Sequence, residues 1–416
     1  MQIDRKVLII GYVWPEPTTT AAGGRMLQLV HFFLERDFQV TFASTATESE
    51  FSFDLETLGI DKISIHLNHS SFDGFISRLN PAIVLFDRFM TEEQFGWRVA
   101  QQVPDAIRIL DTEDLHSLRS VRQIAHKKNT LFLEEDWLQA DITKREIASI
   151  YRCDLSLIIS LYEMKLLERV LGEGNKLLLH LPLMYPSIGE TERESWRDYH
   201  NKEDFICIGN GKHLPNVAAV HRLKKEIWPL IHKEMPQCKL WIYGAYLPEN
   251  IKRMHAPKEG FHIMGHVRDS GTAMSNARLN LAPLSFGAGI KGKLLEGMVV
   301  GTPSVTTPIG AEGICDDMPW NGIIADSSQE FADAAVALYG NRIQWETARE
   351  NGAAILNSFY NKKVLKSLLY DKIGGLRSDL KKHRAQNFIG SLLLHHTLAS
   401  TKYMSKWIEA KNSPGK

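Results

Sequence analysis

A glycine-rich segment in the second half of the chain has residue types suited to binding a phosphate or diphosphate. It reads Gly287-Ala-Gly-Ile-Lys-Gly-Lys293 and follows the strand-like run Leu279–Ala282. Glycines let a backbone pass close to a ligand, and a helix that begins near Lys293 would point free N–H groups at the same space. Lys291 and Lys293 add positive charge, and Glu296, one turn later, has a carboxylate suited to the vicinal hydroxyls of a ribose. The segment therefore predicts a site for the nucleoside diphosphate of a nucleotide sugar.

The same glycines, Gly287, Gly289 and Gly292, also fit the G-x-G-x-x-G pattern of dinucleotide-binding proteins. Glu312, about twenty positions further on, would then bind the ribose of NAD. Against this interpretation, Pro283 interrupts the preceding strand, and the first strand-to-helix turn of the chain lacks the glycine pattern. An NAD-dependent oxidoreductase is the alternative function, and a plain turn with two solvated lysines is the alternative without a ligand.

Polar residues follow two apolar runs in the first half of the chain. Asp87 comes directly after Ile83–Phe86, and Asp111 and His116 come after Ala106–Leu110. Parallel sheets expose their sites at the carboxyl ends of the strands, where these residues would bind sugar hydroxyls or transfer a proton. Alternatively, Asp111 caps the next helix, and a lone histidine is structural.

The two halves of the chain show the same alternation of short apolar runs with longer amphipathic ones, which is typical of a parallel sheet covered by helices. The predicted strands of the first half are 7–10, 39–43, 62–66, 83–86, 106–110, 155–159 and 176–179. Those of the second half are 205–208, 239–243, 262–264, 279–282, 304–307 and 323–325. We expect an α/β fold with two Rossmann-like domains that face one cleft.

The length and composition agree with this division. The chain has 416 residues, which at about 150 per domain indicates two or three domains. We expect an N-terminal acceptor domain (1–186), a polar linker (187–204), a C-terminal donor domain (205–360) and a helical tail (361–416). The 49 Lys and Arg balance the 49 Asp and Glu, so no general attraction to nucleic acid is predicted.

Several motifs in the second half resemble the donor domain of the GT-B glycosyltransferases of family four, the glycosyl transferases group 1, in a branch that carries a GAGIKGK segment. They are Gly209-Asn-Gly-Lys-His-Leu-Pro-Asn216, Glu226-Ile-Trp-Pro229, Pro236, Tyr243-Gly244, Gly265-His-Val267 and the block from Gly287 to Gly313. The resemblance implies the GT-B fold, with a nucleotide sugar held by the second domain and an acceptor held mainly by the first.

The donor motif departs from the family pattern at two places. The usual E-x7-E motif keeps its second acid, Glu296, but has Ala288 at the first position, and Asn210 stands where the family has an arginine. The donor-binding residues that the resemblance implies are Asn210, Lys212, Gly287, Ala288, Gly289, Ile290 and Glu296. Lys212, Lys291 and Lys293 are the candidates to balance the diphosphate.

The resemblance also places the loop Tyr12–Ala22, which ends at Gly23-Gly24-Arg25, in the cleft. In related enzymes a glycine pair at this place opens the first helix near the donor phosphate. Arg25 is then a candidate contact to the phosphate or the acceptor, and the alternative is a helix start with a surface arginine.

The implied activity is transfer of a sugar from a UDP, GDP or dTDP sugar to a glycan or lipid-linked acceptor, in the synthesis of a bacterial-type surface polysaccharide or glycoconjugate. Lys291 and Lys293 would stabilise the leaving diphosphate, so we expect neither a metal nor another cofactor. In a retaining enzyme, as the family implies, the departing phosphate oxygen takes the acceptor proton. An inverting enzyme would use Asp87, Asp111 or His116 as the base. Because position 288 lacks its acid, a non-catalytic GT-B scaffold is a third alternative.

The end of the chain is basic. From Arg377 to Lys416 it has eight Lys or Arg and two Asp or Glu, in helix-like patterns such as Phe388–Trp407. This predicts either a surface that touches anionic lipid or a solvated helix packed back on the first domain. With no apolar run of transmembrane length and four widely spaced cysteines, we expect a cytoplasmic protein, with peripheral contact at the inner face of the membrane as the alternative.

Overall fold

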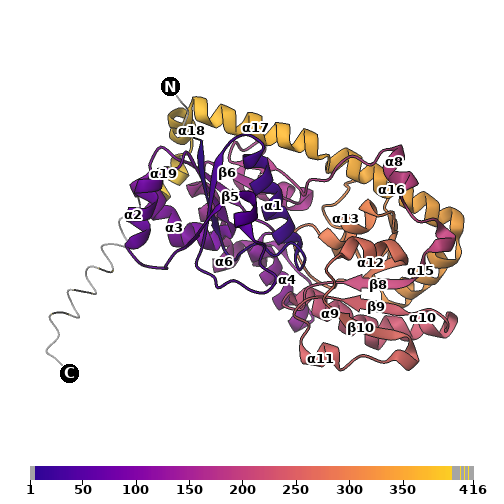
Figure 1. The fold of residues 1–416 in the computed structure, drawn as a ribbon. Helices are drawn as coiled ribbons and strands as arrows, with labels where there is room; N and C mark the ends of the chain where they lie inside the picture. Colours follow the sequence, from indigo (N-terminus) through magenta and orange to yellow (C-terminus); the bar gives the residue numbers. More distant parts are fainter. Residues whose placement is uncertain (1–4, 396–402, 404–406, 408–410, 412–416) are drawn as a thin grey trace.

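The computed structural model describes residues 5–395 and the single positions 403, 407 and 411. The described chain forms two parallel sheets of seven and six strands with helices packed on both faces of each (Figure 1). Each of the predicted apolar runs is a strand, within one or two residues at its ends. The prediction of two Rossmann-like domains is therefore confirmed.

The first sheet has the strand order β3-β2-β1-β4-β5-β6-β7. Its strands are β1 Lys6–Gly11, β2 Gln39–Ser44, β3 Asp61–Ser64, β4 Ile83–Asp87, β5 Ile107–Asp111, β6 Leu155–Ile158 and β7 Leu178–His180. Its helices are α1 Ala21–Leu34, α2 Ser71–Leu79, α3 Arg88–Gln102, α4 His116–Lys128, α5 Glu134–Gln139, α6 Asp141–Arg152 and α7 Leu161–Leu171. The order reverses between β1 and β4, so the connections after these two strands diverge and leave a crevice at their carboxyl ends.

The second sheet has the order β10-β9-β8-β11-β12-β13, with the same kind of reversal between β8 and β11. Its strands are β8 Glu203–Ile208, β9 Leu240–Tyr243, β10 Phe261–Gly265, β11 Ala277–Ala282, β12 Ser304–Thr306 and β13 Gly322–Ile324. The helices are α8 Glu190–Glu194, α9 Leu214–Arg222, α10 Trp228–Glu234, α11 Glu249–Lys252, α12 Ser270–Asn276, α13 Gly292–Val299, α14 Pro308–Ala311, α15 Ser328–Gly340 and α16 Arg342–Phe359.

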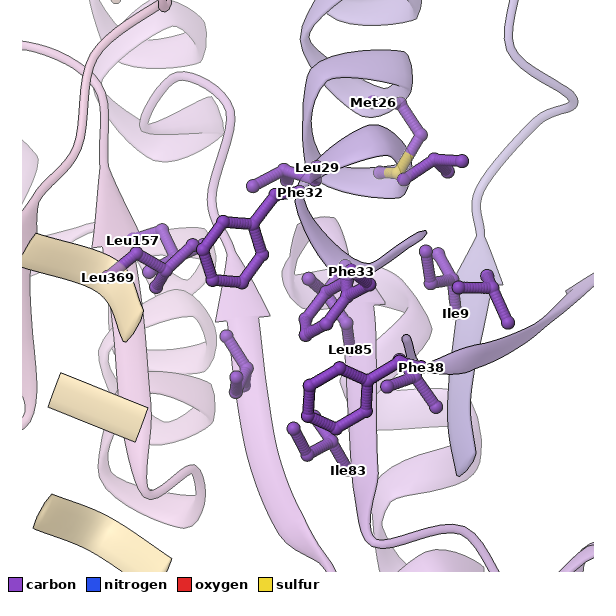
Figure 2. Close-up of a cluster of buried hydrophobic side chains, with 14 of the residues drawn as sticks. Ile9, Met26, Leu29, Phe32, Phe33, Phe38, Ile83, Leu85, Leu157 and Leu369 are labelled. Atoms are coloured by element: carbon purple, nitrogen blue, oxygen red, sulfur yellow. The ribbon is translucent and has the colours of Figure 1, made fainter. Parts of the chain in front are cut away.

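The first sheet is buried on both faces because alternate residues of its central strands are apolar in both directions. Val7 and Ile9 of β1 join the core beneath α1, whereas Leu8 and Ile10 join the core beneath the helices of the other face. Figure 2 shows the first of these cores, where Phe33 of α1 points toward the strands of the sheet. This packing fixes the strand ends that carry the candidate site residues.

The chain returns to the first domain near its C-terminus. Helix α17 (Lys362–Ser378) runs from the second domain along the first (Figure 1), and its Leu365, Leu369, Ile373 and Leu376 join the core beneath α1. The helices α18 (Leu380–Gln386) and α19 (Phe388–Leu394) follow, and α19 lies against α6. Most of the predicted helical segment Phe388–Trp407 beyond α19 lies outside the described residues. No helix of the described part is long and apolar enough to cross a membrane.

The segment 187–204, which we expect to be a linker, lies against the second domain. It contains α8, and the indole of Trp196 is buried and donates a hydrogen bond to the carbonyl of Val299 (2.9 Å). The chain crosses between the domains at Tyr185 and again at Asn361, where the two segments pair side by side.

Candidate active site

The glycine-rich segment forms the connection between β11 and α13, at the carboxyl edge of the second sheet. The ammonium of Lys291 donates to the carbonyl of Gly289 (2.8 Å), and that of Lys293 donates to the amide oxygen of Asn216 (2.7 Å). Burial lowers the pKa of both lysines, because it takes their positive charges out of water. An anionic group beside the two ammonium groups would stabilise their positive charges in place of water. This is the part that the predicted phosphate would have.

Glu296 lies one turn into α13, as predicted. Its carboxylate accepts a hydrogen bond from the hydroxyl of Ser270 (3.1 Å), and burial raises its pKa against the opposing effects of this bond and of Lys293. The side chain is therefore held at the boundary of α12 and α13, on the same helix as Lys293.

Two glycines of this segment lie against the first domain. A Cβ on Gly289 would lie 2.7 Å from the Cβ of Asp114, and one on Gly292 would lie 2.5 Å from that of Ala21. Both neighbours belong to the first domain. Gly289 also has a left-handed backbone (φ 65°), which favours glycine. These two glycines let the first domain approach the second, and their approach to a ligand stays a prediction.

Ala288 occupies the first acid position of the motif and is only 8% exposed. Its methyl group belongs to an apolar core of the first domain, together with Leu110 and Leu115. A carboxylate in this position would lose its hydration among apolar side chains, which is a physical reason for the departure from E-x7-E. Ile290 is buried in a different apolar cluster, with Ile159.

Glu312 is not free to bind a ribose. Arg122 of α4 binds it in a bidentate pair (2.6 and 2.8 Å) and also donates to the carbonyl of Gly287 (2.9 Å). The acid on which the NAD alternative depends therefore joins the two domains, and the structure removes the support for that alternative.

Arg25 and Asp111 are both fully buried (0% exposed) and bind each other. The guanidinium reaches the two carboxylate oxygens at 2.8–3.1 Å and also donates to the carbonyl of Leu181 (2.7 Å). In this arrangement each group satisfies the other, so neither is free to contact a phosphate, a sugar or an acceptor, and the predicted roles of Arg25 and Asp111 stay predictions. The pair instead joins α1 to β5. Gly23 and Gly24 lie in the first turn of α1, as predicted. A Cβ on Gly23 would lie 2.5 Å from the backbone of Glu16, so the preceding loop of the same domain packs against this glycine.

The segments that follow β4 and β5 have strained backbones and carry buried acidic side chains. Arg88 (φ 70°) and Glu113 (φ 57°) both have left-handed backbones, which are unfavourable for residues with side chains. Asp87 accepts from the backbone N–H of Tyr12 (3.0 Å), and burial raises its pKa. Burial and the nearby charge of Asp111 raise the pKa of Glu113 to about 8. Asp87 therefore stays a candidate at the carboxyl edge of the first sheet.

His116 begins α4 beside Asp114, with 3.2 Å between its Nδ1 and the carboxylate. Burial lowers the pKa of His116 to about 4, although Asp114 opposes this effect. Burial would raise the pKa of Asp114, but Arg119 and His116 outweigh it and lower the pKa to about 2. At neutral pH the histidine is therefore uncharged and can accept a hydrogen bond, next to an ionised aspartate that orients it.

Residues 202–341 match the family model of the Glycosyl transferases group 1. This confirms the predicted resemblance, whereas the GAGIKGK branch stays a prediction. No curated protein matches the chain at a significant level.

Solved structures with the GT-B architecture superpose on nearly the whole chain. The sucrose-phosphate synthase of Thermosynechococcus elongatus has a TM-score of 0.66 at 13% identity, covering 90% of this chain and 99% of its own. The Anabaena protein HepE, in complex with UDP and glucose, has a TM-score of 0.63 at 12% identity, covering 89% and 100%. WaaG, a glycosyltransferase involved in lipopolysaccharide biosynthesis, has a TM-score of 0.57 at 11% identity, covering 88% and 98%. The chain therefore has the GT-B fold.

Two predicted donor-binding residues of the second domain lie at its junction with the first, and one of them, Asn210, contacts the first domain directly. Asn210 donates to the carbonyl of Thr19 (3.4 Å), and Lys212 lies over the ring of Tyr246 (3.4 Å to the ring centre). The hydroxyl of Tyr246 in turn donates to Glu16 of the first domain (3.0 Å). These contacts hold the loop between β1 and α1 against the second domain. The two domains are therefore in a closed arrangement. A hollow beside Gly209 and Asn216 has a volume of only about 10 Å³.

Sequence reasoning missed three polar residues at this junction. Arg119, in the first turn of α4, binds Asp114. His213 directly precedes α9 of the second domain. Burial and the charge of Arg119 lower the pKa of His213 to about 4, with Lys291 and Lys293 also close enough to contribute. The third is Glu163, which accepts from the N–H of Gly289 (2.8 Å). The spacing of Arg119 from His116, three positions on a helix, is a signal that could have found the first of them.

Proposed function

We propose that the protein transfers a sugar from a nucleoside diphosphate sugar to a glycan or lipid-linked acceptor. The observation that carries this proposal is the buried Lys291 and the half-buried Lys293 at the start of α13, one turn from the half-buried Glu296, inside the segment that matches the group 1 family. Within the part of the chain that the structure describes, neither lysine has a carboxylate as its hydrogen-bond partner. A diphosphate beside them would accept charge-assisted hydrogen bonds from both ammonium groups.

Each group has a part in the proposed transfer. Lys291, Lys293 and the N–H groups of α13 stabilise the negative charge that develops on the leaving diphosphate. Glu296 accepts hydrogen bonds from the ribose hydroxyls. We propose the retaining mode, in which the departing phosphate oxygen takes the acceptor proton and no protein base is needed. The uncharged imidazole of His116 and the carboxyl group of Asp87 then bind sugar hydroxyls at the edge of the first sheet.

Closing of the domains positions the acceptor and excludes water that would hydrolyse the donor. The donor must enter when the domains are apart, because the loops of both domains contact each other across the junction in the closed arrangement. We propose that the two lysines make a divalent ion unnecessary and that the enzyme has no other cofactor.

The first test is thermal stabilisation by UDP, GDP, dTDP and NAD. We expect one nucleoside diphosphate to raise the Tm, since a ligand that binds only the folded state stabilises it by mass action. Glu296→Ala should weaken its affinity by about 10- to 150-fold, because a charge-assisted hydrogen bond contributes about 1.5–3 kcal/mol. Glu249→Ala, an exposed acid on α11 of the same domain, is the control and should leave the affinity unchanged.

Each other outcome has a meaning. Stabilisation by NAD alone would return the oxidoreductase alternative. Nucleotide binding without turnover over a broad panel of sugars would support the non-catalytic scaffold. No stabilisation by any of the four would contradict the proposed function.

We further propose a place at the inner face of the membrane, in the synthesis of a surface polysaccharide or glycoconjugate. On α19, Phe388 is 75% exposed and Leu392 is 57% exposed, and the exposed lysines Lys381 and Lys382 precede them on α18. Apolar side chains beside basic ones suit insertion into a layer of anionic lipid headgroups. The lipid-linked acceptor would then be reached without leaving the membrane surface.

Co-sedimentation with vesicles tests this contact. We expect binding to vesicles of phosphatidylcholine with phosphatidylglycerol, and weaker binding at high salt. The variant Phe388→Ser/Leu392→Ser should bind at least fivefold more weakly, because it removes apolar area that the membrane would bury. Ile343→Ser is the matched control, because Ile343 on α16 of the other domain is 78% exposed. Equal binding by both variants would contradict the proposal.

A further inference from the structure

The turn that begins α7 is the place where the first domain receives the glycine-rich loop of the second. Glu163, in the first turn of α7, is only 1% exposed. One oxygen of its carboxyl group accepts two backbone hydrogen bonds, from Leu115 of the first domain (3.0 Å) and from Gly289 of the second (2.8 Å). The other oxygen is buried and has no hydrogen-bond partner among the described residues. A single side chain therefore joins the two domains through backbone groups.

The bond to Gly289 is one end of a short chain of contacts that reaches the candidate phosphate site. The N–H of Gly289 is held by Glu163, and the carbonyl of the same residue accepts from the ammonium of Lys291 (2.8 Å). The left-handed backbone of Gly289 gives the two groups of this residue their directions. A displacement of Gly289 would therefore move the ammonium of Lys291.

A second side chain of the first domain holds the other end of the loop. Arg122 donates to the carbonyl of Gly287 while it binds Glu312. Between these two anchors lies Ala288, with its methyl group in the apolar core of the first domain. Both anchors act on backbone atoms, so the loop is positioned without an acid at position 288.

We propose that Glu163 is a positioning residue for the transfer reaction: on domain closure it fixes the Gly287–Lys291 loop and thereby places the ammonium of Lys291 against the donor diphosphate. The second part of this inference rests on the proposed function, whereas the link between Glu163 and closure does not. The carboxyl group of Glu163, from the first domain, thus lies beside Ala288, the motif position that has no acid in this chain.

The charge state of Glu163 indicates which substitution should preserve this role. Burial raises the pKa of Glu163 to about 8, and the negative charge of Asp114 contributes in the same direction, whereas Lys291 opposes it. The group is therefore mostly uncharged at neutral pH. Glutamine has the same shape and is neutral, and its amide oxygen can accept both backbone hydrogen bonds.

The experiment combines domain closure with kinetics. Fluorescence energy transfer is measured between dyes on Lys144→Cys in the first domain and Lys252→Cys in the second, since both lysines are exposed and all four natural cysteines are buried. We expect Glu163→Ala and Glu163→Asp to lower the closed population, whereas Glu163→Gln keeps the wild-type value. Glu168→Ala, on the same helix but without a side-chain contact to Gly289, is the control.

With the nucleotide sugar identified by the first test, Glu163→Ala should lower kcat by at least tenfold with a smaller change in KM, and Glu163→Gln should stay within threefold of the wild type. Glu163→Asp serves if the alanine variant does not fold, because its carboxyl group is one methylene too short to reach both N–H groups. Wild-type closure and kcat in Glu163→Ala or Glu163→Asp, or equal losses in Glu163→Gln, would overturn the inference. If the wild type shows no turnover, the proposed function fails while the fluorescence still tests the role of Glu163 in closure.

Discussion

Replacement of Lys291 by alanine is expected to lower kcat by about 100- to 1,000-fold, the effect typical of removing one preorganised group that stabilises transition-state charge. Lys291 is only 8% exposed, so its charge acts in a medium that screens it weakly. It is also held in place by the carbonyl of Gly289 before the donor arrives. Steady-state kinetics with the nucleotide sugar found by thermal stabilisation measures the effect.

Lys258→Ala is the control for this prediction, because Lys258 is an exposed lysine of the same domain. Lys291→Arg keeps the charge but not the size, so it should recover only part of the lost rate. A Lys291→Ala variant that folds and keeps kcat within threefold of the wild type would contradict the assignment of Lys291 to the diphosphate.

The alternation of apolar and amphipathic runs in the sequence was sufficient to predict two parallel sheets covered by helices. Each strand of a buried parallel sheet must be apolar on both faces, and this local property is visible in runs such as Val7–Ile10. The position of the candidate donor site was predictable for a similar reason, since Lys291, Lys293 and Glu296 lie within six residues of each other on one connection and helix start.

The contacts between segments far apart in the sequence were not predictable. Arg25 and Asp111 are 86 residues apart, and Glu163 and Gly289 are 126 apart. A charged residue at a strand end carries no local sign of whether it faces solvent, a ligand or a partner of opposite charge. The glycines posed the same problem, because their lack of a side chain indicated a close approach but not whether a ligand or the other domain approaches.

The second large effect concerns folding. Arg25→Ala is expected to lower the free energy of unfolding by about 3–5 kcal/mol, because it leaves Asp111 as a buried charge without its partner. The pair is fully buried, and the guanidinium also satisfies the carbonyl of Leu181, so three segments of the first domain lose a common contact. Urea denaturation measures the change. Arg5→Ala, which breaks the exposed pair with Asp37, is the control and should cost less than about 1 kcal/mol.

The double variant Arg25→Met/Asp111→Leu separates the loss of a partner from the value of the pair itself. A buried ion pair pays a large desolvation cost, so replacing both members by apolar residues of similar size is expected to recover most of the stability lost in Arg25→Ala. The double variant should also keep nucleotide binding, because the lysines of the second domain are untouched. If Arg25→Ala instead folds with wild-type stability but loses turnover, the pair opens during the reaction, and the initial prediction that Arg25 contacts the phosphate or acceptor regains its support.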